Sequence, residues 1–252
     1  MNLTLIDFEI IGPALLAGIL ITLTHIPLGQ RVLKRGIIFL DLAVAQVAGL
    51  GIIIAHSFHH DPNNWQVQII AITAAIIGVI FLNHTEKHWP EIQEAIIGSL
   101  FVLASSAGIL LLAASPQGSE QLRDLLIGQI LWVNYEQLIP VALLYAAVLF
   151  SWFKFGQHNN SLKFYLLFAV TITASVQLVG IYLVFATLIL PALATKKMTS
   201  NSLKVGYLIG IIAYLSGLSI ASLVDLPAGG VIVFSLALIS LITIFIQLKI
   251  KA

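Results

Sequence analysis

The chain has 252 residues, of which 59% are hydrophobic and 9% are charged, and its formal net charge is +1. A soluble domain carries about 25% charged residues, so this composition, with a mean hydropathy of +1.03, excludes an ordinary soluble globular protein. The absence of cysteine excludes disulfides, thiolate metal sites and a cysteine nucleophile.

Apolar runs separated by short clusters of charge fill almost the whole chain. A run such as residues 37–55 is about long enough to cross the ~30 Å hydrocarbon core as a helix. The runs are continuously apolar rather than alternating, which predicts helices rather than membrane β-strands. We therefore predict an all-α, polytopic membrane helix bundle of eight or nine transmembrane helices, forming one transmembrane domain over residues 1–252.

The apolar runs also give the expected helices in chain order. The predicted ranges are 10–28, 37–55, 65–83, 92–114, 138–156, 164–195, 203–223 and 229–249. No cleavable signal sequence is evident before the first run, so we expect that run to remain in the membrane as a helix.

Basic clusters predict the orientation of these helices, because short loops rich in Lys and Arg stay in the cytoplasm. Residues 31–35 hold the strongest early basic cluster, so we expect loop 29–36 to be cytoplasmic and the N-terminus to lie outside. Loop 56–64 is then on the outer side and has no Lys or Arg. The lysines of 196–204 mark a second cytoplasmic segment.

The stretch 164–195 does not fit this orientation as a single crossing. Lys154 and Lys163 also predict a cytoplasmic loop, so one crossing would leave the lysines of 196–204 outside. We expect two short or broken helices that turn near residues 177–180, or a re-entrant segment. The alternative is one long, tilted helix with one loop misassigned.

Asp41 lies inside the second predicted helix, where a carboxylate costs at least ~2.5 kcal/mol and normally faces a partner, a cavity or a pathway. It is within about one turn of the cytoplasmic end, so the alternative is an acid that snorkels or caps the helix and pairs with Arg35. Gln46 lies deeper in the same helix and needs hydrogen-bond partners there. Five helical steps of about 100° place Asp41 and Gln46 roughly 140° apart, so they are poor candidates for chelating one ion together.

Two further acids stand at predicted helix ends. Glu94 opens the fourth helix, and we expect the helix dipole to stabilise it. Asp225 lies between the last two helices, in the sequence SLVDLPAGG on the predicted outer side. It is either a cap of the final helix, which starts just beyond Pro227, or an anionic group at the mouth of a cation pathway.

Histidines form the only dense cluster of candidate metal ligands in the sequence, on the predicted outer loop. The cluster consists of His56, His59, His60 and Asp61. Imidazole and carboxylate groups suit zinc, manganese or nickel. The alternative is a polar outer loop that binds no metal.

The sequence contains no recognisable catalytic motif. It has no HExxH, GxSxG or GxxxxGK[ST] pattern, so we expect no enzymatic activity and no cofactor bound by this chain. If ATP drives the protein, the nucleotide must be bound by another chain.

Residues 176–197, VQLVGIYLVFATLILPALATKK, resemble a hallmark of the permease subunits of zinc/manganese-type ABC importers. In that family an apolar helix with a Gly-x-x-Leu-Val start runs into a Leu-x-x-Pro-Ala sequence and a basic cluster. The matching positions are Gly180, Leu183, Val184, Leu188, Pro191, Ala192 and Ala194. Segments 97–112, 124–133 and 225–233 also resemble family motifs, in the family's order.

The second helix departs from the family pattern. Family members usually carry an Asp and a His four residues apart there, associated with the metal path. Gln46 takes the place of the histidine here, and Asp41 is displaced by one residue from the place of the aspartate. Asp225, by contrast, keeps its family-like Asp-Leu-Pro-x-Gly setting.

A second departure is the cytoplasmic segment that usually docks on the ATPase. It is reduced here to residues 156–163. Either docking has moved to another cytoplasmic loop, such as 196–204 or 84–91, or the coupling is altered.

The resemblance implies a permease domain over residues 1–252 that serves as the membrane-spanning subunit of an ABC importer for a divalent metal ion, zinc or manganese. It implies a homodimer in the bacterial inner membrane, working by alternating access with an ATP-binding subunit and an extracytoplasmic substrate-binding protein. We expect no nucleic-acid partner. The candidate metal-binding residues are Asp225, Asp41, Gln46, His56, His59 and His60.

Two other functions stay open at this point. The shortened docking segment favours an ATPase-independent membrane carrier for cations, although the order of the family-like motifs opposes it. The third alternative is a structural membrane protein without a transported substrate.

Overall fold

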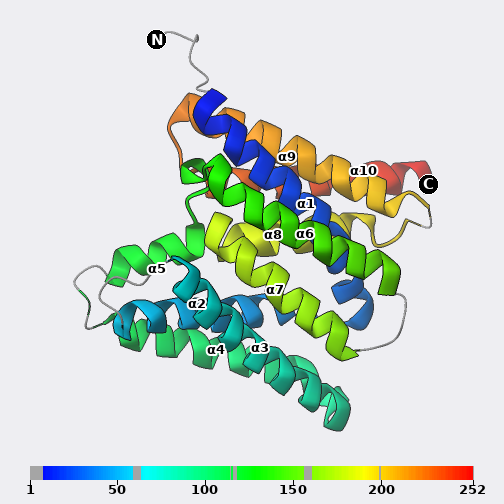
Figure 1. Cartoon of the computed structure of the whole chain (residues 1–252). Helices are drawn as coiled ribbons and strands as arrows, with labels where there is room; N and C mark the ends of the chain where they lie inside the picture. Colours follow the sequence, from blue (N-terminus) through cyan, green and yellow to red (C-terminus); the bar gives the residue numbers. More distant parts are fainter. Residues whose placement is uncertain are drawn as a thin grey trace. The chain divides into compact units, whose positions relative to one another are not determined.

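The computed structural model describes residues 8–58, 64–113, 115, 118–155, 161–198 and 200–251. The predicted candidates His59 and His60 lie outside these residues. Figure 1 shows the described part, in which no strand occurs and ten α-helices follow one another. The prediction of an all-α membrane protein is confirmed, because eight of these helices are long and apolar enough to cross a membrane.

The helices have the following bounds. They are α1 (Phe8–Arg35), α2 (Leu40–Phe58), α3 (Asn64–His88), α4 (Gln93–Leu112), α5 (Gly118–Ile127), α6 (Tyr135–Phe155), α7 (Ser161–Val179), α8 (Ile181–Thr195), α9 (Ser202–Val224) and α10 (Ala228–Lys251). Short 3-10 helices, η1 (Pro90–Ile92) and η2 (Ile130–Trp132), precede α4 and α6.

The predicted break in the stretch 164–195 is confirmed. α7 and α8 are separate helices, and Gly180 between them has a φ of 79°, which ends the α-helical path. α8 has 15 residues and is therefore about 22 Å long. It is shorter than the other apolar helices, and eleven of its residues are buried.

Other helix boundaries differ from the predicted ones. α1 continues through the basic cluster to Arg35, so the predicted loop 29–36 is mostly helix. α3 continues to His88. Both extensions are polar or basic, and an apolar run marks only the part of a helix that the hydrocarbon core requires. α5 was not predicted, because its ten residues are too few and too polar for a membrane span.

The chain divides into two compact units, each built from separate stretches of sequence. The first unit consists of Met1–Gly36, Ile127–Tyr145 and Leu178–Ala252, and the second consists of Ile37–Leu126 and Ala146–Gln177. Among the described residues, the glycines with positive φ are Gly36, Gly128 and Gly180. Each lies at, or within three residues of, a point where the chain passes from one unit to the other.

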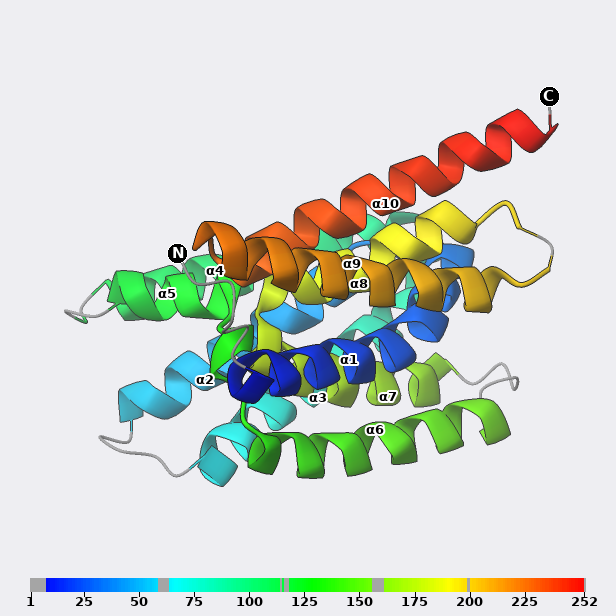
Figure 2. The ribbon, with the colours of Figure 1, turned by 90° about the horizontal axis from the view of Figure 1, so that it is seen from above.

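In the first unit, α1 packs against α8 and α9, and α10 packs against the same two helices (Figure 2). Glycines let α9 approach α1 closely. A Cβ on Gly206 would lie 2.7 Å from Cγ2 of Ile26, and one on Gly210 would overlap Thr22. Since residue numbers fall along α9 as they rise along α1, the two helices are antiparallel.

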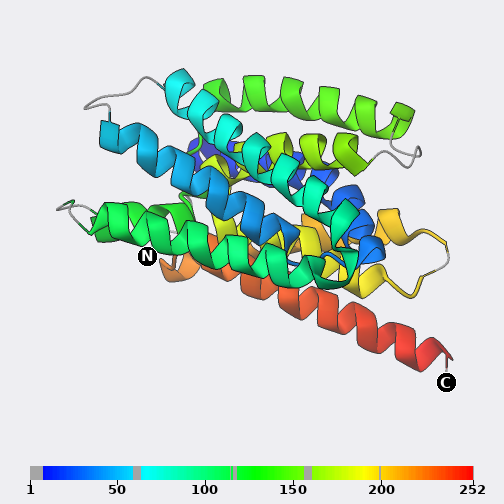
Figure 3. The ribbon, with the colours of Figure 1, turned by 90° about the horizontal axis from the view of Figure 1, so that it is seen from below.

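In the second unit, α2 lies between α3 and α4 (Figure 3). Gly51 of α2 permits close contact with α3, since a Cβ there would lie 2.9 Å from Cα of Ala71. At the far end of α3, the hydroxyl of Ser161 in α7 donates a hydrogen bond to the carboxylate of Glu86. The start of α7 therefore lies beside the end of α3.

Contacts within each unit place the helix ends that carry the basic clusters. In the first unit, Gln30 Nε2 donates to Thr195 Oγ1 at 3.2 Å, so the basic end of α1 and the lysines after α8 lie at the same end. In the second unit, His56 near the end of α2 and Gln177 near the end of α7 line one pocket. The separate helices α7 and α8 supply the two segments that the charge pattern around 164–195 requires.

Candidate functional site

The carboxyl group of Asp41 is buried at the start of α2. Its side chain is 1% exposed, so the alternative of a snorkelling acid is wrong. The backbone amides of Asp41 and Leu42 lie near the carboxylate, but neither oxygen makes a hydrogen bond within the described residues. A buried carboxyl group without partners is costly, and inside a membrane helix such a group indicates a functional site.

A second acid, Glu94, forms a hydrogen bond to the backbone just before α2, the helix in which Asp41 lies. The Ile38 amide donates to Glu94 Oε1 at 2.6 Å, so a carboxylate from α4 satisfies a backbone donor just before α2. The predicted first-turn position of Glu94 in α4 is confirmed. Its other oxygen, Oε2, is buried without a hydrogen bond in the described structure. The start of α2 thus has two acidic side chains with free acceptor oxygens.

Gln46, one turn further along α2, is also buried, with 6% of its side chain exposed. Asp41 and Gln46 are five residues apart on the same helix, so their side chains leave the helix axis in different directions. The role of either residue in binding a metal stays a prediction.

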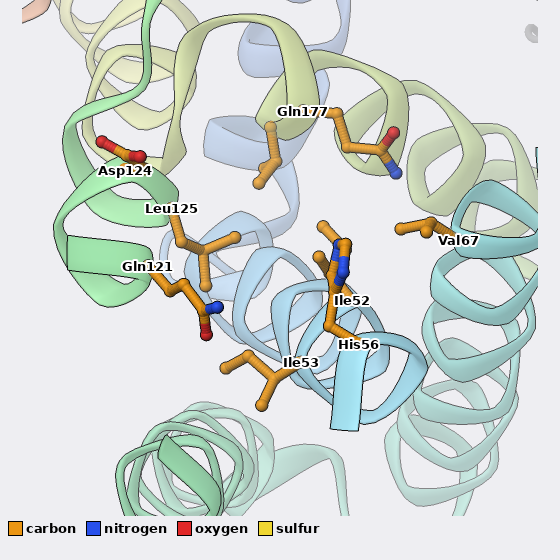
Figure 4. A pocket seen from close by; sticks show the side chains of 9 residues that line it. Ile52, Ile53, His56, Val67, Gln121, Asp124, Leu125 and Gln177 are labelled. Atoms are coloured by element: carbon orange, nitrogen blue, oxygen red, sulfur yellow. The ribbon is translucent and has the colours of Figure 1, made fainter. Parts of the chain in front are cut away.

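A pocket of about 350 Å³ in the second unit contains the predicted candidate His56 (Figure 4). Residues from α2, α3, α5 and α7 line it. They are Ile52, Ile53, His56, Val67, Gln121, Asp124, Leu125, Val176 and Gln177. The apolar lining side chains are buried or half-buried, whereas the four polar ones, His56 among them, are exposed.

The polar groups of this pocket do not converge on one point. In Figure 4, Leu125 lies between the ring of His56 and the carboxylate of Asp124. Within the described part of the chain, no three His, Cys, Asp or Glu side chains are grouped closely enough to hold a metal ion. The predicted histidine metal site therefore stays a prediction that depends on residues outside the described part.

Asp225 stands at the end of α9 rather than at the start of α10. It has φ 56° and ψ 47°, its amide donates to the Ala221 carbonyl, and its side chain is exposed. α10 begins three residues later, at Ala228, directly after Pro227. The interpretation of Asp225 as a cap of the final helix is therefore wrong: it is the left-handed residue that ends the preceding helix. A role at a cation pathway is not affected by this correction.

Sequence reasoning missed several buried polar residues, among them His25 in α1, whose side chain is 0% exposed. The signal was present, because a histidine inside a transmembrane run is uncommon and is a functional candidate by default.

Comparison with known proteins decides the family. The model of the ABC 3 transport family matches residues 7–160 and 156–247, which together span nearly the whole chain. The chain belongs to the ABC 3 transport family. The resemblance to metal-importer permeases stated from the motifs is thereby confirmed.

Relatives that resemble the chain are named as metal transport proteins. The high-affinity zinc uptake system membrane protein ZnuB of Haemophilus influenzae is 24% identical, covering 94% of this chain and 98% of ZnuB. The manganese transport system membrane protein MntC of Halalkalibacterium halodurans is 28% identical, covering 91% of this chain and 84% of MntC.

A solved structure shares the fold. A chain of PsaBC from Streptococcus pneumoniae in complex with Fab matches with a TM-score of 0.76 and 22% identity, covering 98% of this chain and 96% of that one. This ABC 3 family member thus shares the fold of that PsaBC chain.

Proposed function

We propose that this ABC 3 family protein is the membrane-spanning permease subunit of an ABC importer for a divalent metal ion, zinc or manganese. The observation on which the proposal rests is the family match over nearly the whole chain, with relatives named as zinc and manganese transport proteins. Both compact units then belong to one permease domain over residues 1–252.

Asp41 supports a cation as the cargo. Its buried carboxyl oxygens lack hydrogen-bond partners in the described structure, and oxygen anions are ligands for manganese and zinc. The alternating-access cycle would give the cation access to this carboxylate from one side at a time. Gln46 and Asp225 are further candidate positions on the path.

The proposed orientation follows the basic clusters. The end of α1 with Lys34 and Arg35, and the lysines after α8, lie at one end of the first unit, and this end is cytoplasmic by the positive-inside rule. The N-terminus is then outside, in a bacterial inner membrane, and the pocket with His56 opens to the outer side.

We propose that the subunit works as a homodimer with two partners, an ATP-binding subunit and an extracytoplasmic substrate-binding protein. ATP hydrolysis resides in the ATP-binding subunit. On the cytoplasmic side, the turn between α3 and α4 presents exposed Trp89 and Ile92. Hydrogen bonds from Gln93 Nε2 to the Leu82 carbonyl at 2.9 Å and from Thr85 Oγ1 to Gln93 Oε1 at 2.9 Å hold this turn in place. It is a suitable docking surface for that subunit.

The test is reconstitution of the complete transporter. The chain is coexpressed with a candidate ATP-binding subunit from the same genome, copurified, and placed in liposomes with a candidate binding protein. ATP-dependent uptake of radiolabelled zinc or manganese is the expected result. Uptake without any ATP-binding subunit would support the alternative, an ATPase-independent carrier. Copurification without uptake of any divalent cation would refute the metal cargo.

A further inference from the structure

His25 is the one imidazole that the structure places deep within the first unit. It lies in the middle of α1, its side chain is 0% exposed, and Thr22 and Thr24 beside it are also buried. A polar side chain in this position is costly in a membrane helix unless it is bonded or functional.

The hydrogen bonds of His25 determine which ring nitrogen carries the proton. Nδ1 lies 2.9 Å from the Ile21 carbonyl oxygen. That oxygen can only accept, so Nδ1 must donate. Nδ1 also lies 3.0 Å from Thr24 Oγ1, but the single hydroxyl proton of Thr24 points to the carbonyls of residues 20 and 21. In the neutral ring, Nε2 is therefore the atom with the free lone pair.

This free lone pair has no partner among the described residues. His25 Nε2 is buried and makes no hydrogen bond. Thr22 Oγ1, which is three residues earlier and hence on nearly the same face of α1, is also buried and unbonded. Two acceptor atoms in adjacent turns of one helix are thus left without donors.

The arrangement at His25 is that of a metal-binding imidazole. A histidine that binds a metal usually donates its other ring N–H to a backbone carbonyl or a carboxylate, which fixes the tautomer and orients the ring. Nδ1 is fixed in this way by Ile21, and Nε2 is the atom left to bind a cation. Neutral imidazole is a common ligand for first-row divalent metals.

We infer that His25 Nε2 is a ligand for the divalent cation during its passage through the protein, with Thr22 Oγ1 as an adjacent oxygen donor. The inference rests on the proposed function, because it adds a binding residue for the cation that the proposed importer carries. The cation is held only in transit, so the complete burial of His25 in one conformation is consistent with this role.

The first test uses His25→Gln and His25→Ala in the complete reconstituted transporter. Loss of the ligand should raise the half-saturating concentration of zinc or manganese roughly tenfold or more, since even groups that merely support a ligand change metal affinity by about 10–100-fold. The thermal unfolding of the complex should stay close to wild type for His25→Gln, because glutamine keeps a polar side chain that can bond to the helix.

The second test exploits the cysteine-free chain. In His25→Cys, a thiolate replaces the imidazole, so micromolar Cd²⁺ should block uptake and a chelator should restore it. Ser240→Cys is the control: Ser240 is buried in α10 of the same unit, and its hydroxyl is likewise unbonded. Uptake by this variant should be insensitive to Cd²⁺.

The outcomes separate the inference from the proposed function. Wild-type uptake kinetics in both His25→Gln and His25→Ala, or equal Cd²⁺ sensitivity of the two cysteine variants, would overturn the role of His25 and leave the importer intact. Failure of the wild-type complex to transport any divalent cation would overturn both.

Discussion

Gly128 and Gly180 meet backbone to backbone. A Cβ added to Gly128 would overlap the carbonyl group of Val179, and one added to Gly180 would overlap the amide nitrogen of Gly128. Both glycines have positive φ, 71° and 79°. The turn that follows α5 is thus locked against the break between α7 and α8, and neither position has room for a side chain.

We expect Gly180→Ala to destabilise the protein more than Gly36→Ala does. Both residues have positive φ, for which a non-glycine residue costs about 1–2 kcal/mol. A Cβ on Gly36 would meet nothing within 4 Å, so that variant measures the backbone strain alone. Thermal unfolding in detergent checks the order. Gly98→Ala, in open space within α4, is the control and should be neutral or stabilising. Equal losses of thermal stability in Gly36→Ala and Gly180→Ala would show that the contact between Gly180 and Gly128 does not contribute to stability.

The orientation can be tested with single cysteines. We expect a cysteine in place of Ser200, next to the lysines after α8, to resist an impermeant thiol reagent added outside spheroplasts. A cysteine in place of Ser115, between α4 and α5, should react. The physical reason is that basic segments stay in the cytoplasm. Labelling of the cysteine at position 200, together with protection of the cysteine at position 115, would show that the orientation is the reverse of the proposed one.

For Asp225 we expect different effects of substitution on folding and on transport. Its left-handed conformation suits Gly and Asn, so Asp225→Asn and Asp225→Gly should unfold at about the wild-type temperature. Asp225→Leu should lose about 1–2 kcal/mol from backbone strain. If the carboxylate serves the cation path, all three variants reduce metal uptake. Normal uptake by the asparagine and glycine variants would reduce Asp225 to a helix-ending residue.

Asp41→Asn should lower metal uptake by roughly tenfold or more, equivalent to at least about 1.4 kcal/mol in transport, without lowering stability. The carboxyl oxygens of Asp41 have no hydrogen bonds within the described structure, so an amide of nearly the same shape breaks no existing bond. Uptake and thermal unfolding are measured on the same preparation. Glu94→Ala is the contrasting variant, because it removes the acceptor of the Ile38 amide and should lower stability. A stability loss in Asp41→Asn as large as that of Glu94→Ala would assign Asp41 a structural role.

Helix existence could be predicted from the sequence because the bilayer demands a fixed length of apolar chain. The same reasoning found the break at Gly180, since the basic residues on either side of 164–195 required two crossings. It could not find α5, whose ten residues never cross the membrane. It also could not divide the chain into two units, because contacts such as that between Gly29 and Leu188 join segments far apart in sequence.

The site was less predictable than the fold. Hydropathy located Asp41, but its burial and its lack of hydrogen bonds depend on the packing of α2 among α3 and α4. Asp225 looked like a helix start from its neighbours Pro227 and Ala228, whereas its backbone conformation makes it a helix end. The free Nε2 of His25 follows from the hydrogen bond between Nδ1 and the Ile21 carbonyl of the same helix. No pattern of residue types reveals that hydrogen bond.

The discontinuous build of the first unit also affects how the protein is made. α1, with its buried Thr22 and His25, leaves the ribosome early, yet α8 and α9, which pack against it, are synthesised only after the whole second unit. Until then α1 must stay inserted with two polar side chains that have no lasting neighbours, and its apolar residues must suffice to retain it. In variants that slow the insertion or packing of α9, the polar face of α1 would stay exposed for longer. Membrane quality-control proteases could then degrade the protein even when every transport residue is intact.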